Sequence, residues 1–143
     1  METIKVGLLG LGTVGGGTLT ILRDTLTEIE RRLGGRTTIE VTHAAVRDLE
    51  RARGIDTDTL TLTDDPMAVA KNADIDVVIE LMGGTTLAKQ CLIAAIESGK
   101  HIVTANKALI AEHGNTLLAL AEQNQVMVAY EAAVAGGIPI IKA

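Results

Sequence analysis

Gly10-Leu11-Gly12-Thr13-Val14-Gly15 is a glycine-rich stretch with an apolar segment before it and a longer amphipathic segment after it. Residues 4–9 are mostly apolar, as in a short buried strand, and residues 13–33 repeat leucine and isoleucine at steps of three and four, as on one face of a helix. The GxGxxG spacing is common by itself and becomes informative when it joins a strand to a helix. This order of elements therefore predicts a turn that binds the pyrophosphate of a dinucleotide.

Each residue of the turn has an expected role. Gly10 allows a tight turn, Gly12 lets the pyrophosphate approach the backbone, and Gly15 lets the helix pack close to the strand. Free N–H groups at the start of the helix, those of Thr13 and Val14 among them, favour an anion together with the helix dipole. The alternative is a tight turn that only reverses the chain. A Walker loop is excluded because no Gly-Lys-Ser/Thr sequence follows.

The rest of the chain continues to alternate strands with helices. Further strands are expected at residues 38–46, 76–82, 101–104 and 126–130. Further helices are expected from about residue 65, at residues 85–98 and at residues 113–124, whereas residues 47–65 are polar and less regular. Apolar strands between amphipathic helices predict an α/β fold of the Rossmann type, a doubly wound parallel sheet with helices on both faces. The expected strand order is 3-2-1-4-5, with the ligand at the carboxyl ends of the strands near the switch point.

The composition limits the class of protein. All 143 residues are interpreted as one NAD(P)-binding domain, whose core consists of Val, Ile, Leu and Ala because the chain has one Tyr and neither Phe nor Trp. The net charge of −5 argues against nucleic acid and anionic membranes as partners. No apolar run approaches the roughly 18 residues that would span a membrane, and the N-terminus lacks a signal-peptide pattern. A cytoplasmic protein is therefore expected.

Two further positions are expected to contact the cofactor. Arg47-Asp48 follows the second predicted strand, where an acidic residue binds the ribose hydroxyls of NAD and an arginine accepts the 2′-phosphate of NADP. Arg47 favours NADP, with NAD as the alternative through Asp48, and a solvated charge pair is the other interpretation. Gly83-Gly84 ends a central strand. It either leaves room for the nicotinamide side of the cofactor, with Gly83 in contact, or forms a simple turn into the next helix.

Three segments of the sequence resemble one family. They are GLLGLGTVGGG (residues 7–17), VVIELMGGTTLAKQCLIAAIESGKHIVTANKALIA (residues 77–111) and AYEAAVAGGIPIIKA (residues 129–143). Together they closely resemble the N-terminal NAD(P)-binding domain of homoserine dehydrogenase, and the resemblance covers essentially the whole chain. It implies an oxidoreductase that interconverts L-homoserine and L-aspartate 4-semialdehyde with NAD(P), in threonine, methionine and isoleucine biosynthesis, and that is usually a homodimer.

The same resemblance implies roles for residues near the end of the chain. Lys107 would contact NADPH together with the glycine turn and Arg47, and it would be a catalytic residue that orients the substrate oxygen and stabilises negative charge there. A monovalent cation such as sodium would be held at four positions: Glu131, Val134, Gly136 and Ile138. Oxygen ligands, including backbone carbonyls, suit such a cation. Without the resemblance, the same loop would be interpreted as a connection into the next domain.

Residues from about 131 onward are expected to lead into a substrate and dimerisation domain that this sequence does not contain. The chain alone is therefore expected to bind cofactor and to be inactive, because turnover needs a substrate held against the nicotinamide. Two alternatives are a stand-alone dinucleotide-sensing regulatory module and a dehydrogenase that forms a covalent thioester at Cys91. For Cys91, a buried position in the core is favoured over a nucleophilic one.

Overall fold

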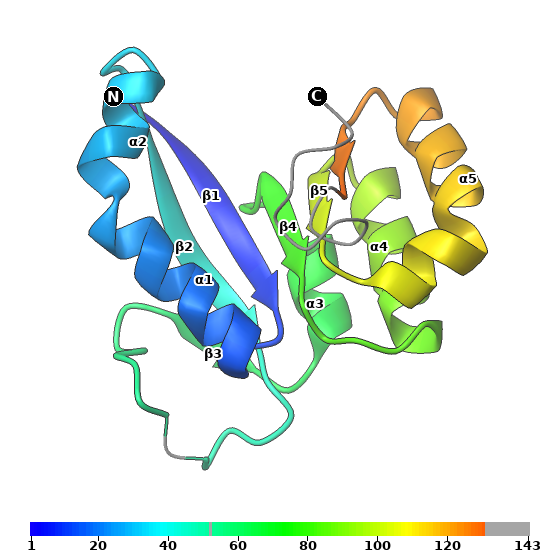
Figure 1. Cartoon of the computed structure of the whole chain (residues 1–143), viewed down its shortest axis with the longest axis horizontal. Coiled ribbons are helices and arrows are strands. Elements are labelled where there is room, and N and C mark those ends of the chain that lie inside the picture. Colours follow the sequence, from blue (N-terminus) through cyan, green and yellow to red (C-terminus); the bar gives the residue numbers. More distant parts are fainter. Residues whose placement is uncertain (52, 131–143) are drawn as a thin grey trace.

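The computed structural model describes residues 1–51 and 53–130, and within them the chain forms one six-stranded parallel sheet (Figure 1). The strand order is β3-β2-β1-β4-β5-β6. The strands are β1 (Glu2–Leu9), β2 (Thr37–Ala45), β3 (Thr61–Thr63), β4 (Val77–Glu80), β5 (His101–Thr104) and β6 (Val128–Ala129). The predicted doubly wound parallel sheet is confirmed.

Five helices of the described chain cover the two faces of this sheet. They are α1 (Thr13–Asp24), α2 (Leu26–Arg32), α3 (Pro66–Lys71), α4 (Thr86–Glu97) and α5 (Lys107–Gln123). Buried side chains of α3, α4 and α5 form one core cluster with Leu9, Val78 and Ile102 of the strands. A second cluster joins Leu19 of α1 to Val6 and Leu8 of β1. Because Leu8 and Leu9 are successive strand residues, the two clusters lie on opposite faces.

The predicted strand order was wrong for one strand. Residues 76–82 were expected at the outer edge beside the second strand, but β4 pairs with β1 on its other side, with Val6 opposite Val77 and Leu9 opposite Glu80. The outer position belongs to β3, which lies in the segment of residues 47–65 that the sequence predicts to be polar and irregular. A strand of three residues, Thr-Leu-Thr, is too short to show an alternation of apolar and polar side chains.

Two predicted helices also have different bounds. The single helix expected at residues 13–33 is divided at Thr25, where φ is −107° and ψ is 12°, and where the Thr25 hydroxyl donates to the Ile21 carbonyl at 2.6 Å. Such back-bonding by threonine bends helices. The last helix begins at Lys107 rather than near residue 113, because the side chain of Asn106 accepts a hydrogen bond from Leu109 N at 3.0 Å and caps the helix there.

The sheet brings three turns to one edge. β1, β2 and β4 end together, since Leu9 lies opposite both Ala45 and Glu80. The chain runs from β1 outward to β2 and β3, and then returns to β4 on the other side of β1. The order reverses between β1 and β4, and this switch point is where open α/β sheets bind ligands. Within residues 1–51 and 53–130, no helix is both long enough and apolar enough to cross a membrane.

Candidate functional site

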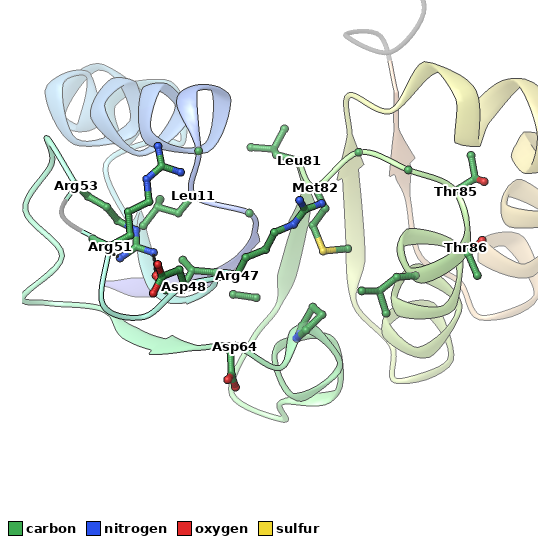
Figure 2. Close-up of a pocket in the computed structure, with 18 residues that line it drawn as sticks. Leu11, Arg47, Asp48, Arg51, Arg53, Asp64, Leu81, Met82, Thr85 and Thr86 are labelled. Carbon is green, nitrogen blue, oxygen red and sulfur yellow. Dashed lines mark hydrogen bonds between the residues drawn. The ribbon is translucent and has the colours of Figure 1, made fainter.

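A pocket of about 550 Å³ lies at this edge of the sheet, between the turns that follow β1, β2 and β4 (Figure 2). Its walls are formed by Gly10, Leu11, Gly12, Ala45, Val46, Arg47, Asp48, Arg51, Arg53, Asp64, Pro66, Leu81, Met82, Gly83, Gly84, Thr85, Thr86 and Leu87. The volume is in the range of pockets that enclose small molecules and cofactors. Gly10, Leu11, Gly12, Arg47 and Gly83 were predicted as cofactor contacts, and the fold brings all five together.

Two glycines of the turn are explained by contacts within the protein. Gly10 has a φ of +104°, and a side chain there would also lie 3.0 Å from the Leu81 carbonyl oxygen. A Cβ at Gly15 would lie 2.3 Å from the Gly10 carbonyl oxygen. Gly10 therefore permits the turn, and Gly15 permits the start of α1 to approach it, as the sequence predicted.

Gly12 is different from its two neighbours. Among the described residues, no atom lies within 4 Å of a Cβ built at this position, and its φ of −80° is open to any residue. Packing against the described residues therefore gives no reason for a glycine here, and φ does not require one. Gly12 nevertheless lines the pocket, so the missing side chain leaves space for a ligand that approaches the backbone. This open cradle fits a pyrophosphate group.

The start of α1, directly after Gly12, presents unpaired N–H groups, although the predicted contacts Thr13, Val14 and Gly15 are not among the described residues that line the pocket. The first helical hydrogen bond runs from Gly16 N to the Gly12 carbonyl at 2.8 Å, so the N–H groups of Thr13, Val14 and Gly15 precede the bonded turns. In the described part of the chain, no side chain caps α1 and no acidic residue occupies its first turn. Asp65 caps α3 and Asn106 caps α5, whereas α2 and α4 also lack a side-chain cap from the described residues. The free donors and the helix dipole suit an anion.

Charged side chains gather at the end of the pocket beside β2. Arg47 and Asp48 follow this strand directly and are exposed, and Figure 2 shows the Arg47 side chain extended across the pocket towards the turn after β4. Arg51 and Arg53 line the same end. Arg53 stabilises the loop, since its guanidinium donates to the carbonyls of Asp48 at 2.5 Å and Arg51 at 2.9 Å.

Sequence reasoning missed Arg51 and Arg53, although the signal was present. Three arginines occur within residues 47–53, directly after a predicted strand. Only Arg47 was weighed, because the expected position of the cofactor residue is the end of the strand itself. The structure shows that Arg51 and Arg53 line the pocket, which the spacing alone does not reveal.

The opposite end of the pocket is uncharged. It is formed by Gly83, Gly84, Thr85 and Thr86. Figure 2 shows Thr85 and Thr86 at the far side from Arg51 and Arg53. Gly83 and Gly84 both have positive φ angles, of 76° and 73°. Two successive residues in this conformation require glycine. The described atoms leave open space around both positions, so this turn presents bare backbone to the pocket.

Lys107 and Cys91 do not line this pocket. Lys107 is exposed at the first residue of α5, and the described residues that line the pocket do not include it. The expected cation ligands Glu131, Val134, Gly136 and Ile138 lie outside the described residues. Cys91 is completely buried in α4, and burial, reinforced by Asp65 and Glu80, raises the pKa of its thiol. This confirms the core position and argues against a thiolate nucleophile.

Comparisons with known proteins agree with this geometry. Residues 10–131 match the model of the family described as "Homoserine dehydrogenase, NAD binding domain". A homoserine dehydrogenase of Neisseria gonorrhoeae is 53% identical over 145 residues, which cover 100% of this chain and 32% of that protein. One of Pseudomonas aeruginosa is 54% identical over 143 residues, again 100% of this chain and 32% of that protein.

A solved structure gives the same result. The crystal structure of a homoserine dehydrogenase from Thiobacillus denitrificans superimposes with a TM-score of 0.92 at 53% identity, over 99% of this chain and 32% of that one. The chain thus spans about a third of the length of the relatives it matches. The pocket, the bare glycine turn and these matches lead to one assignment. The chain belongs to the family of homoserine dehydrogenase NAD-binding domains.

Proposed function

We propose that this chain holds the nicotinamide dinucleotide of a homoserine dehydrogenase. The whole enzyme would interconvert L-homoserine and L-aspartate 4-semialdehyde in threonine, methionine and isoleucine biosynthesis. The observation that carries the proposal is Gly12, which lines the pocket, has a negative φ and has open space where a side chain would be. Family membership favours this enzyme over a stand-alone sensing module, because the named relatives are about three times as long as the chain.

Each part of the dinucleotide is proposed to lie against a different wall of the pocket. The pyrophosphate would lie against Gly12 and the free N–H groups of α1. The adenosine half would extend towards Arg47 beside β2, as in other sheets of this type. The nicotinamide half would then lie at the opposite end, against Gly83 and Gly84. When bound, the cofactor supplies the acceptor or donor of a hydride, and the chain supplies orientation.

NADP is the proposed cofactor rather than NAD. Arg51 lines the end of the pocket where the adenosine ribose would lie, and the Arg47 side chain extends from that end across the pocket (Figure 2). Guanidinium groups bind phosphate in a bidentate way. The Asp48 carboxylate already accepts a hydrogen bond from Glu50 N at 2.9 Å, which leaves fewer acceptor positions for ribose hydroxyls. Two cationic groups beside a partly occupied carboxylate favour a ligand with an extra phosphate.

The roles of Lys107 and of the last residues rest on the family. Lys107 is exposed at the start of α5, at the sheet edge that holds the pocket, and it would orient the substrate oxygen there. A monovalent cation would be held by Glu131, Val134, Gly136 and Ile138. We also propose that the whole enzyme contains a substrate-binding part, forms a homodimer and is cytoplasmic. The chain alone would bind cofactor without turning over substrate.

Calorimetric titration of the chain with NADPH, with NADH and then with L-homoserine tests the proposal. We expect a single dinucleotide site, tighter binding of NADPH than of NADH, and no heat from homoserine. Binding of neither dinucleotide by a folded chain would overturn the cofactor role. Tighter binding of NADH would overturn the NADP preference alone. Homoserine oxidation by the whole protein, measured from the absorbance of the reduced nicotinamide, tests the enzyme activity.

A further inference from the structure

A buried carboxylate lies beneath the turn after β4. Glu80 is the last residue of that strand and is completely buried. Its Oε1 accepts hydrogen bonds from Met82 N at 2.9 Å and from Gly83 N at 3.3 Å. Its Oε2 accepts a hydrogen bond from the hydroxyl of Thr104 at 2.7 Å, across the sheet in β5. One side chain thus connects the turn after β4 to the end of β5.

The connection continues from Thr104 back to the first turn. The Thr104 hydroxyl oxygen accepts a hydrogen bond from Asn106 N at 3.1 Å. The Asn106 side chain donates from Nδ2 to the Gly84 carbonyl at 2.5 Å, and its Oδ1 accepts from Leu109 N at 3.0 Å. Glu80, Thr104 and Asn106 therefore join the turn of residues 81–84 to the start of α5 at two separate points. We call these three residues the buried polar network.

Packing alone does not explain this network. A carboxylate is costly to remove from water, and an apolar residue of similar size at the end of β4 would avoid that cost. Thr104 is completely buried as well, and Asn106 is only 9% exposed. Three polar side chains at one point of an otherwise apolar core are expected where a particular backbone conformation has to be maintained.

The conformation that they maintain belongs to the pocket wall. Met82, Gly83 and Gly84 all line the pocket, and the two glycines have no side chains that could anchor them. Glycine pairs have many accessible conformations, so this turn needs fixed hydrogen bonds to stay in one of them. The network supplies those bonds at Met82 N, Gly83 N and the Gly84 carbonyl.

We propose that Glu80, Thr104 and Asn106 are positioning residues that order the turn of residues 81–84 for the nicotinamide half of the cofactor. The inference rests on the proposed function, since it assigns the nicotinamide half to this end of the pocket. It goes further in giving a role to three residues that do not contact the ligand. The adenosine half, bound at the other end, is independent of the network.

Thr104→Val tests the network with little change of side-chain shape. It removes the hydroxyl and leaves an oxygen of Glu80 and the N–H of Asn106 without their partner. We expect NADPH to bind about tenfold more weakly, as the loss of one buried hydrogen-bond partner implies. The fluorescence gain of the reduced nicotinamide on binding should fall. Binding of 2′,5′-ADP, which lacks the nicotinamide half, should change less than twofold. Thr104→Ser retains the hydroxyl and should restore both NADPH affinity and fluorescence.

Other outcomes overturn the inference in distinguishable ways. Unchanged NADPH affinity and fluorescence in Thr104→Val would show that the network does not order the turn. Equal weakening of NADPH and 2′,5′-ADP would show a general effect on the fold. If Thr104→Val does not fold, Glu80→Gln gives the same comparison. The amide of glutamine has one acceptor oxygen instead of two, so it can accept the hydrogen bonds of the turn or that of Thr104, but not both. An unmodified chain that binds 2′,5′-ADP but not NADPH overturns the inference, and one that binds neither overturns the proposed function.

Discussion

Gly12 and Gly15 lack side chains for different physical reasons. A Cβ at Gly15 would lie 2.3 Å from a backbone oxygen, whereas the described residues leave a Cβ at Gly12 in open space. The glycine turn of residues 10–15 therefore contains one glycine that leaves space for a ligand, Gly12, and one that the packing of the fold requires, Gly15. Substitutions at the two positions should separate ligand binding from stability.

We expect Gly12→Val to abolish binding of NADPH and NADH, by at least about 100-fold, because it fills the space through which the pyrophosphate approaches the backbone. Its free energy of unfolding should change by no more than about 1 kcal/mol, the typical effect at a helix N-cap. Gly15→Ala should instead destabilise the fold by about 1–3 kcal/mol through overpacking. Calorimetry and urea unfolding of both variants measure this. Retained dinucleotide binding in Gly12→Val would show that the pyrophosphate lies elsewhere.

Arg47→Ala tests the phosphate preference. We expect NADPH affinity to fall about 10-fold to 100-fold, since a charge-assisted hydrogen bond is worth about 1.5–3 kcal/mol, while NADH affinity changes little. Arg36→Ala is a matched control, because Arg36 is an exposed arginine outside the pocket. Equal losses for both dinucleotides in Arg47→Ala would show that Arg47 does not bind the 2′-phosphate.

Residues of the site differ in how far the sequence could predict them. The glycines and Arg47 lie at fixed distances from a strand end, so a local pattern located them. Glu80 is visible in the sequence as one acid in an apolar strand, but its side-chain partner, Thr104, is 24 positions away. Only the pairing of β4 with β5 brings the two together. Contacts between strands are therefore what the local pattern could not supply.

At the scale of elements, long periodic segments were predicted and short ones were not. α4 and the strands of the core matched their predicted positions to within a few residues. β3 was missed because three residues carry no period, and this omission displaced β4 in the predicted strand order. The early start of α5 was missed because its cap, Asn106, follows the strand so closely. Side-chain capping is a local signal that was available and not used.

The cap of α3 provides a test at this scale. The Asp65 carboxylate accepts a hydrogen bond from Met67 N at 3.0 Å at the start of a helix of six residues. We expect Asp65→Ala to lower the free energy of unfolding by about 1 kcal/mol, and Asp65→Asn to lower it by less, because asparagine is also a good N-cap. Chemical denaturation of the two variants measures the difference. Equal effects would show that the side-chain cap does not stabilise α3.

At the scale of the whole molecule, Cys91 reports on unfolding. It is the single cysteine of the chain, it is completely buried, and α4 packs against both α3 and α5. Its thiol can react with a reagent only when these helices separate. The raised pKa of the buried thiol reduces its reactivity further.

We expect labelling of Cys91 by a disulfide reagent to be slow in the native chain and fast in denaturant. NADPH at 100 times its dissociation constant should slow the labelling about 100-fold, because ligand binding to the folded state adds about 2.7 kcal/mol of stability. The rate of reagent release, followed by absorbance, measures this. Rapid labelling that NADPH does not affect would show that α4 opens locally, without loss of the fold.

The central place of β1 has a consequence for synthesis on the ribosome. Lys5 N is bound to the Asp76 carboxylate, 71 positions later in the chain, and β1 pairs with β4 at the same edge. At a translation rate of about 5–20 residues per second, roughly 4–14 s pass between the synthesis of Lys5 and that of Asp76. During that interval β4 is missing, so the backbone N–H and C=O groups of β1 that will pair with it are unpaired and accessible to chaperones. The cofactor cannot assist folding in that period, because half of its binding site has not yet been made.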